Sequence, residues 1–587
     1  MAEIWIWNAM ASRRRSASDT FIENGLAVLK AGVEKNGHTV RVLDWARNDF
    51  YQQLAPAILA RPIRALTVRL MAARRRGFLF KAGAALAFGL QQLLARTQKR
   101  RMASALRALA RDAAANRLRI FGVKVWYGEA FTWAKFLAGE IRRLSPETVL
   151  VAGGYHATLY EEDLLENSPF DLAVISEGET PLTRILEAVD DTDPAAGRQG
   201  ILDRIAAKAG NGAVANLLWR EGGRIRKTAK GFCDINARSM PDYGDTRGKA
   251  LLHVLLESSG CAWGKCRFCV HQHLEPEYRK RDVERIVQEI RTLCRQGIGL
   301  FRFAGSDTPP DFGSAIAQGI LDAGLRIEFA MGSRARPDAK NPEVFEDLVG
   351  RYALLIRAGL RAIFMGGETG HDAINDQVMN KGLVREDLIW TMRALRESEK
   401  RTGQKVDIGL AMIYPTPLIE GVTDEDVLAA NIELVDAARP DSVMVSPPGP
   451  FKNSEWYRRR DEFGFELDEG VIPKMMEYEY VLYKPPELWP KLGIRHRGRD
   501  FAELLRLCGK MRAAIEKLGV QTDLSDEHFL MLRACGLQGP EGAEAFKRVT
   551  LADIVSCDYR RLAEYCERTN DYSRKLAAQA EHSSASQ

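Results

Sequence analysis

Short apolar runs alternate with segments of helical periodicity through the first 205 residues. Apolar residues recur at a helical spacing within 22–33 and 131–144. Five runs are short enough to be buried strands: residues 4–7, 39–43, 120–127, 149–152 and 174–175. Strands that alternate with helices predict a doubly wound, Rossmann-like parallel sheet. Such a sheet binds its ligands at the carboxyl ends of the strands.

The same alternation resumes between residues 250 and 450. Six apolar runs are predicted to be strands there: residues 251–256, 300–303, 327–331, 362–365, 406–413 and 442–445. Six strands with intervening helices predict an incomplete α/β barrel, whose chemistry takes place at the carboxyl ends of the strands. Glycine and polar residues follow several of these runs, as a site at that end requires.

The pattern between and after these two α/β regions sets the expected domain boundaries. Residues 213–228 are predicted to form a hairpin that turns at a glycine pair, followed by an extended linker. The sequence after 470 has mainly helical periodicity. We therefore expect a sheet domain at 1–205 with a basic helical insert at about 50–118. A hairpin and linker at 206–245, a barrel at 246–460 and a helical C-terminal region at 461–587 should follow it.

Composition places the chain among ordinary globular proteins. Its 587 residues are 46% apolar and 28% charged, and nine cysteines are too few for a disulfide scaffold. No charged region precedes an apolar run at the N-terminus, so we expect no secretory signal. No apolar stretch reaches the ~20 residues of a membrane span. The sequence predicts a cytoplasmic protein.

The net charge of +6 is unevenly distributed. Residues 61–120 hold fifteen Arg or Lys and a single acid, Asp112, so this segment carries +14 and the remainder carries −8. Three interpretations remain open: a solvated helical face, a contact with the inner membrane surface or another anionic partner, and nucleic-acid binding. Nucleic acid is disfavoured, because few aromatic residues for base stacking lie in this segment.

Three cysteines within nine residues, Cys261, Cys266 and Cys269, directly follow the first predicted barrel strand. Thiolates this close together can converge on one soft metal centre. A four-iron cluster would leave one iron open, whereas tetrahedral zinc would need a fourth ligand from His271 or His273. A structural role also stays open, because cysteine is often simply buried.

The surroundings of the trio resemble the radical S-adenosylmethionine (SAM) enzymes. In that family three cysteines bind a [4Fe–4S] cluster whose open iron chelates the amino and carboxylate groups of SAM. This chain has four residues between the first two cysteines, where the family has three, and Gly264 can absorb the extra residue. The resemblance makes Phe268 the aromatic residue that packs near the adenine of SAM.

Two strand ends extend this resemblance. Gly366, Gly367 and Glu368 follow the fourth barrel strand, where the family places an acid that contacts SAM, and Asn380-Lys381-Gly382 comes after them. Arg334 follows the third strand, where family members place an arginine near the SAM carboxylate. A helix-capping acid and a surface ion pair are the alternative interpretations. Further segments are expected to line the substrate cavity: residues 305–307, 414–416 and 447–450.

Two glycine-containing loops in the first half resemble cobalamin-binding domains attached to radical SAM enzymes. The expected cobalamin contacts are Gly153, Gly154, Tyr155, His156, Glu177, Gly178 and Glu179. The sequence lacks the Asp-x-His-x-x-Gly pattern that supplies a cobalt ligand in many cobalamin proteins. The resemblance therefore implies cobalt without a protein histidine ligand, and makes His156 a loop residue or a cofactor-edge contact.

The order of these features implies a cobalamin-dependent, class B radical SAM methylase. Such an enzyme uses a 5′-deoxyadenosyl radical and methylcobalamin to methylate an unactivated carbon, with electrons from a donor such as flavodoxin or ferredoxin. Three alternatives remain: radical rearrangement, cyclisation or oxidation without methyl transfer; a cobalamin or iron–sulfur sensor; and a zinc protein. The residues are compatible with a small-molecule, lipid or peptide substrate.

Overall fold

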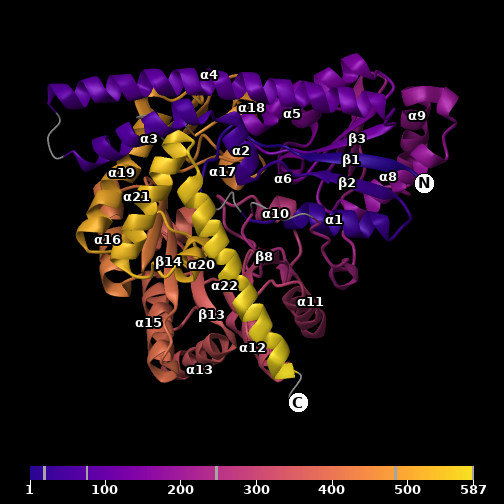
Figure 1. The fold of residues 1–587 in the computed structure, drawn as a ribbon. Coiled ribbons are helices and arrows are strands. Elements are labelled where there is room, and N and C mark those ends of the chain that lie inside the picture. Colours follow the sequence, from indigo (N-terminus) through magenta and orange to yellow (C-terminus); the bar gives the residue numbers. More distant parts are fainter. Residues whose placement is uncertain (17–20, 74–76, 245–248, 481–485, 585–587) are drawn as a thin grey trace. The chain divides into compact units, whose positions relative to one another are not determined.

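The computed structural model describes residues 1–16, 21–73, 77–244, 249–480 and 486–584 (Figure 1). The chain forms two compact units. The first comprises residues 1–249, 470–483 and 547–564, and the second comprises the remainder. The boundary predicted at 245/246 lies outside the described residues.

The first unit is built on a seven-stranded sheet. Its order is β2 (Thr39–Leu43), β1 (Glu3–Asn8), β3 (Ile120–Lys124), β4 (Val149–Gly153), β5 (Leu172–Val174), β6 (Leu217–Glu221) and β7 (Arg224–Lys227). The first five strands are parallel, which confirms the doubly wound sheet. The hairpin prediction is also correct, but β6 pairs with β5 and so extends this sheet. It is therefore not a separate linker.

The strands of this sheet could be predicted from the sequence because the sheet is buried on both faces. Ile4, Ile120 and Val149 are fully or almost fully buried in one apolar cluster, which also contains Leu26 of α1 (Asn24–Glu34) and Ile185 of α8 (Glu179–Asp190). Parallel strands that are covered on both faces consist almost entirely of apolar residues. The runs therefore stand out from the amphipathic helices between them.

The basic insert forms three helices, α2 (Asn48–Leu54), α3 (Ala57–Ala72) and α4 (Phe78–Ala115). The helices α3 and α4 pack against each other, and α4 also packs against α5 (Glu129–Leu144). The expectation that no segment is apolar enough for a membrane span was wrong. Among the described residues one helix, α4, meets that criterion by length and composition, with 17% of its most apolar stretch buried.

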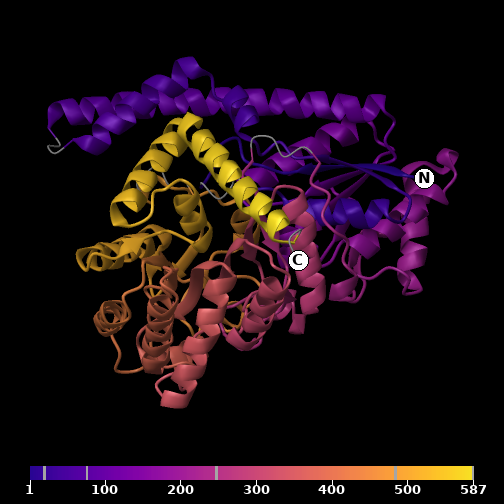
Figure 2. The same ribbon diagram turned by 60° about the horizontal axis from the view of Figure 1, so that its bottom comes forward.

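The second unit contains the barrel. Its parallel sheet has the order β15 (Ser442–Ser446), β14 (Asp407–Ile413), β13 (Leu360–Glu368), β12 (Glu328–Gly332), β11 (Leu300–Phe303) and β8 (Leu252–Leu255). These are the six predicted strands. The sequence missed a seventh, β19 (Gln521–Thr522), which pairs in parallel with β15. Figure 2 shows the helices that cover this sheet, among them α11 (Val283–Arg295), α12 (Pro310–Asp322), α13 (Pro342–Ala358) and α15 (Arg385–Thr402).

The predicted helical C-terminal domain does not exist as one body. Residues 470–483 and 547–564 belong to the first unit, and the rest of this region belongs to the second. In the first unit, α18 (Val471–Glu477) packs against α5, and Gly128 N donates to Met476 O at 2.8 Å. In the second, a small antiparallel sheet precedes α19 (Phe501–Lys517).

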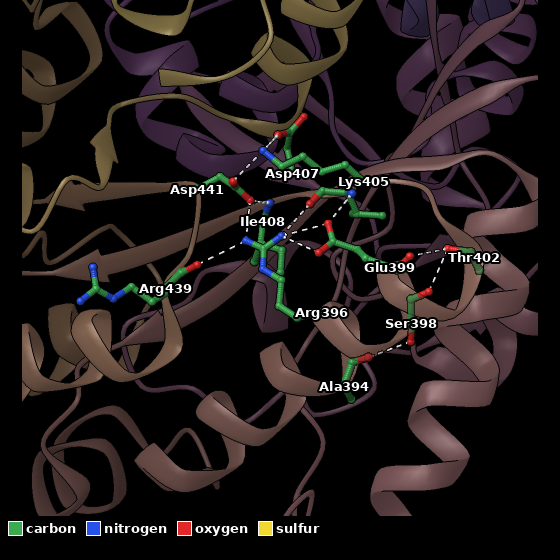
Figure 3. Close-up of polar contacts among 11 residues, drawn as sticks. Ala394, Arg396, Ser398, Glu399, Thr402, Lys405, Asp407, Ile408, Arg439 and Asp441 are labelled. Carbon is green, nitrogen blue, oxygen red and sulfur yellow. Dashed lines mark hydrogen bonds and ion pairs between the residues drawn. The ribbon is translucent and has the colours of Figure 1, made fainter. Parts of the chain in front are cut away.

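A dense polar network lies at the amino ends of the barrel strands, opposite the ends where chemistry is expected (Figure 3). Arg396 of α15 donates to Asp441 at 2.7 Å and to Glu399 at 3.0 Å. Lys405 pairs with Asp441 at 3.0 Å and with Asp407 at 3.2 Å. Groups at this end of a barrel serve stability. The network ties α15 to the starts of β14 and β15.

Candidate functional site

The loop that carries the cysteine trio begins at the carboxyl end of the first barrel strand. Gly260, directly before Cys261, has φ +79°, and a Cβ atom there would lie 2.2 Å from Glu277 O. Only glycine fits this position. Within the loop, Cys269 N donates to Cys266 O at 3.2 Å, and His271 N donates to Cys269 Sγ at 3.5 Å. Backbone N–H groups directed at cysteine sulfur are typical of iron–sulfur sites.

The three thiols lie within electrostatic reach of one another and of two cations. Burial raises the pKa of Cys266 to about 12, while the positive charges of Lys381 and Arg334 act in the opposite direction. Burial also raises the pKa of Cys269, and the nearby Cys261 adds to that rise. A set of soft sulfur donors beside two cations suits an iron–sulfur cluster held by thiolates.

A closed zinc site has a different requirement. It would draw four donors to within about 4 Å of one another around a tetrahedral ion. In the described part of the chain no group of three or more His, Cys, Asp or Glu side chains, the cysteine trio included, is arranged around a single ion position, so this observation does not separate zinc from a cluster. His271, one of the two candidate fourth ligands, uses its Nδ1 in a 2.9 Å hydrogen bond with Ser306 Oγ. Metal-bound histidines commonly make such a bond with their second ring nitrogen, so the contact does not exclude zinc.

The four-residue spacer between Cys261 and Cys266 is held in place by Trp263. Its Nε1 donates to Asn380 O at 2.9 Å, and the Arg334 guanidinium carbon lies 4.3 Å from its ring centroid. A Cβ atom built on Gly382 (φ +61°) would lie 2.3 Å from the ring. Gly382 therefore makes room for the indole. The lengthened spacer thus contains an aromatic clamp, Trp263, which joins the ends of three strands.

Arg334 is positioned by this clamp, and it forms no ion pair with an acid among the described residues. Its Nη2 donates to the carbonyl oxygens of Lys381 and Gly382, and its own backbone N–H donates to Asp307 Oδ1 at 3.0 Å. Its buried Nε has no hydrogen-bond partner among the described residues. Burial lowers the pKa of Arg334 from its usual value. An unsatisfied guanidinium N–H beside the thiols fits a carboxylate ligand.

Glu368, the last residue of β13, forms a buried ion pair with Lys381 at 2.8 Å. Burial lowers the pKa of Lys381, but the charges of Glu368 and Cys266 and the hydrogen bond to Glu368 together outweigh it and hold that pKa above its usual value. Cβ atoms at Gly366 and Gly367 would lie 2.5 Å from Glu368 Oε1 and 2.8 Å from Leu410. Gly366 therefore makes room for the acid, and Gly367 makes room for Leu410. Sequence analysis noted Lys381 within its motif but gave it no role.

The predicted adenine neighbour, Phe268, lies in an aromatic cluster. Its ring centroid is 5.7 Å from that of Trp456, which is fully buried and donates from Nε1 to Val378 O at 3.3 Å. Phe268 itself is half-buried. The ring therefore has one side packed on Trp456 and part of its surface accessible.

Sequence reasoning missed one acid at this end of the barrel. Glu257 comes two residues after β8 and is fully buried. It accepts from Thr308 Oγ1 at 2.7 Å and from Gly305 N at 3.0 Å. Burial raises the pKa of Glu257 and that of Asp307. An acid placed directly after an apolar strand was the available signal. Its bonds hold the loop after β11 against the start of the cysteine loop.

In the first unit, the two predicted cobalamin loops are joined at the carboxyl ends of adjacent strands. Gly153 ends β4, and α6 (Tyr155–Tyr160) begins directly after Gly154. Thr158 Oγ1 accepts from Ser176 N at 2.9 Å and donates to Gly154 O at 3.2 Å. A Cβ atom on Gly154 (φ +96°) would lie 3.1 Å from Lys124. The glycine therefore permits a close approach of backbone and side chain.

The remaining predicted contacts in these loops differ in position. Tyr155 is 46% exposed, so a ligand could reach it. Ser176 Oγ is a buried atom without a hydrogen-bond partner among the described residues, so it could bond to a ligand. Glu177 Oε2 instead accepts from Cys233 N at 2.6 Å, and Glu179 pairs with Arg238 at 3.3 Å. Gly178 caps α8.

One interpretation of the sequence placed His156 in a loop, but the residue lies in a helix. It is in the first turn of α6 and is 2% exposed, with ring centroids 5.0 Å from Phe131 and 4.7 Å from Tyr160. Burial, assisted by the charge of Arg15, lowers its pKa to about 3. The imidazole is therefore neutral and serves as a core side chain of the sheet domain.

The strand order adds residues that the motifs did not indicate. A 2-1-3-4-5 order places the ligand crevice beyond the ends of β1 and β3. There Trp126 Nε1 donates to Asn8 Oδ1 at 3.2 Å, and Lys124 pairs with Glu23 and lies 4.8 Å from the Trp126 ring centroid. An aromatic ring and a cation therefore lie at the carboxyl ends of these two strands.

Comparisons with known proteins agree with this architecture. A family model, the radical SAM superfamily, matches residues 258–430, which span the cysteine trio and Glu368. A curated relative, the anaerobic magnesium-protoporphyrin IX monomethyl ester cyclase of Cereibacter sphaeroides, is 25% identical over 305 residues. That alignment covers 48% of this chain and 45% of the relative, so it spans less than half of that protein.

Two solved structures show the fold of the whole chain. The radical SAM methyltransferase TsrM from Kitasatospora setae, with cobalamin and a [4Fe–4S] cluster bound, is 15% identical with a TM-score of 0.57 over 96% of this chain and 100% of that one. The cobalamin-dependent radical SAM enzyme OxsB, with aqua-cobalamin and SAM bound, is 14% identical with a TM-score of 0.53 over 99% of this chain and 80% of that one. The predicted radical SAM barrel and its accompanying sheet domain are confirmed.

Proposed function

We propose that this chain, which carries a radical SAM domain within the fold of cobalamin-dependent radical SAM enzymes, is an enzyme that transfers a methyl group to carbon. The observation that carries the proposal is the trio of Cys261, Cys266 and Cys269 beside Lys381 and Arg334. These thiols would hold a [4Fe–4S] cluster through three of its irons. Bound cluster and SAM would supply the 5′-deoxyadenosyl radical, and cobalamin would carry the methyl group.

The residues around the thiols would bind and orient SAM. The buried Nε–H of Arg334 would donate to its carboxylate. Glu368 would accept from its amino or ribose groups while Lys381 balances the buried charge. Phe268 would pack against adenine with Trp456 behind it. Each role uses an atom or a surface that the described contacts leave open.

The crevice of the first unit would bind cobalamin by its edge. Gly153 and Gly154 keep the strand end free of side chains, and Tyr155 and Ser176 Oγ offer polar groups there. His156 is packed in the core, which supports cobalt without a histidine from this loop. Glu177 and Glu179 would support the loop through residues 233–238, so we assign them a positioning role.

A second candidate function is radical cyclisation or rearrangement without methyl transfer. It is favoured by the sequence relative from Cereibacter sphaeroides, which is named an anaerobic magnesium-protoporphyrin IX monomethyl ester cyclase. The two candidates use the same cluster and the same SAM residues. They differ in the fate of the methyl group of SAM.

Product analysis separates these functions. The full chain, reconstituted anaerobically with iron, sulfide and cobalamin, would be reduced with dithionite or flavodoxin in the presence of methyl-labelled SAM. Either enzyme would form 5′-deoxyadenosine and methionine from the SAM that is reductively cleaved, but only a methylase would also form S-adenosylhomocysteine and a labelled product. Protein that binds cluster and cobalamin but never consumes SAM would instead be a sensor, and the enzymatic proposal would be wrong.

A further inference from the structure

The helices α3 and α4 leave a large apolar surface exposed. Eight of the sixteen most exposed large apolar side chains in the described residues lie between 58 and 93. They are Ile58, Val68, Met71, Phe78, Leu79, Leu86, Phe88 and Leu93. Leu79 is 85% exposed and Phe78 is 84% exposed, at the start of α4. Patches of this kind mark interaction sites, because isolated exposed residues do not gather in one segment by chance.

The exposed face of α4 changes its chemistry halfway along the helix. Leu79, Ala82, Leu86 and Leu93 recur at spacings of three, four and seven residues, so they share one face. Arg96, Arg100 and Arg107 continue the same spacing, and all three are exposed. The buried residues Leu94, Gln98 and Met102 lie on the other side. One solvent-facing stripe is therefore apolar over its first half and basic over its second.

The charge of the segment selects among partners. Between residues 61 and 120 the only acid is Asp112, against fifteen Arg and Lys. A single-sign basic stripe that adjoins an apolar stripe complements anionic headgroups and the acyl boundary below them. Nucleic acid would use the basic half but would leave the apolar half exposed to water.

The packing of α3 against α4 favours a face that would lie on a membrane over one that would cross it. Figures 1 and 2 both show α3 beside the N-terminal part of α4, and the two helices pack together. If α4 spanned a bilayer, the exposed Arg61 and Arg69 of α3 would enter the hydrocarbon with it, which is strongly disfavoured. A surface position lets these arginines reach headgroups while Phe78 and Leu79 insert.

We propose that the exposed face of α3 and α4 binds the surface of an anionic lipid bilayer. This surface is separate from the cofactor residues and does not depend on the proposed reaction. Its apolar anchor is Phe78 and Leu79, and its electrostatic contact is Arg96 and Arg100, because Arg107 also pairs with Glu140 of α5 at 3.7 Å. The enzyme would then be a peripheral membrane protein whose substrate is drawn from, or released at, the lipid surface.

Flotation of the full chain with vesicles tests the proposal. Vesicles of phosphatidylcholine with 30% phosphatidylglycerol should carry the protein, and pure phosphatidylcholine vesicles should carry far less. The variant Phe78→Ser/Leu79→Ser should reduce the vesicle-bound fraction at least about tenfold. Arg96→Gln/Arg100→Gln should weaken binding roughly fivefold per residue and flatten its salt dependence.

The matched control is Leu488→Ser/Leu551→Ser, which removes two exposed apolar side chains outside this surface. It should float like the unchanged protein, and thermal melting should show that all variants are folded. Binding that is equal for both vesicle types and all variants would overturn the proposal. So would a dimer in light scattering that Phe78→Ser/Leu79→Ser converts to a monomer, because the face would then join two copies of the chain.

Discussion

The guanidinium of Arg334 stacks on the indole of Trp263, with 4.3 Å between the guanidinium carbon and the ring centroid. Trp263 lies in the spacer between the first two cysteines, and Arg334 follows β12. The Trp263 Nε1 bond to Asn380 O adds the loop after β13 to the same contact. One side chain therefore fixes the cysteine loop to two other strand ends.

Removing this clamp should loosen the cluster. Trp263→Ala loses a cation–π contact of about 1–2 kcal/mol and a hydrogen bond of about 1 kcal/mol, so reconstituted protein should lose iron to a chelator roughly tenfold faster or more. Trp263→Phe keeps the stack and loses only the hydrogen bond, so its rate should be intermediate. Iron loss at an unchanged rate in the alanine variant would show that Trp263 does not hold the loop.

The Glu368–Lys381 pair should behave as a buried ion pair. Lys381→Met leaves the Glu368 carboxylate buried and uncompensated, which should lower the free energy of unfolding by about 3 kcal/mol. The double variant Glu368→Gln/Lys381→Met removes that charge and should recover most of the loss. Both variants should bind SAM more weakly in equilibrium dialysis. A double variant as unstable as Lys381→Met would contradict this interpretation.

The buried His156 should make the first unit sensitive to acid. Its folded pKa of about 3 lies below the unfolded value near 6.5, so between these pH values only the unfolded chain is protonated. Stability should therefore fall as pH falls below 6.5, by about 1.4 kcal/mol per pH unit from this residue. Urea unfolding at pH 7, 6 and 5 measures the slope. The variant His156→Leu should show a shallower slope, and parallel slopes would refute the assignment.

The network around Arg396 should affect stability alone. Arg396→Met removes its hydrogen bonds to Asp441 and Glu399 at the amino ends of the strands and should cost about 2 kcal/mol. Iron content and SAM affinity should stay unchanged, because no residue of the candidate site takes part in this network (Figure 3). Lost cluster in a folded Arg396→Met protein would show that the two ends of the barrel are coupled.

The strands could be predicted because a buried strand is visible as an apolar run in its own segment of the sequence. The parallel strands consist mostly of apolar residues, as residues 408–413 do. The two-residue β19 was missed, since two residues give no periodicity. The division of the C-terminal region also escaped prediction. It depends on contacts far apart in sequence, such as the Arg15–Glu479 ion pair at 2.8 Å within the first unit.

The site residues could be predicted only where they form a contiguous sequence motif. The cysteine trio and Gly366-Gly367-Glu368 form contiguous patterns, so sequence reasoning found them. The residues that position them form no contiguous pattern, because Trp263 and Arg334 meet only when the barrel brings their strand ends together. The family resemblance of the turn at 152–158 made His156 a loop residue or a cofactor-edge contact. Its contact with Phe131, from another helix, places it in the core.

The most direct measurement of the central claim is iron and sulfide analysis with electron paramagnetic resonance on anaerobically reconstituted Cys266→Ala. Cys294→Ala serves as the control, because Cys294 is buried within α11 of the same unit. The Cys294→Ala protein should hold four irons per chain, show a reduced [4Fe–4S] signal that shifts on adding SAM, and consume SAM. Cys266→Ala should show none of these properties. An intact, SAM-responsive cluster in Cys266→Ala would contradict the assignment.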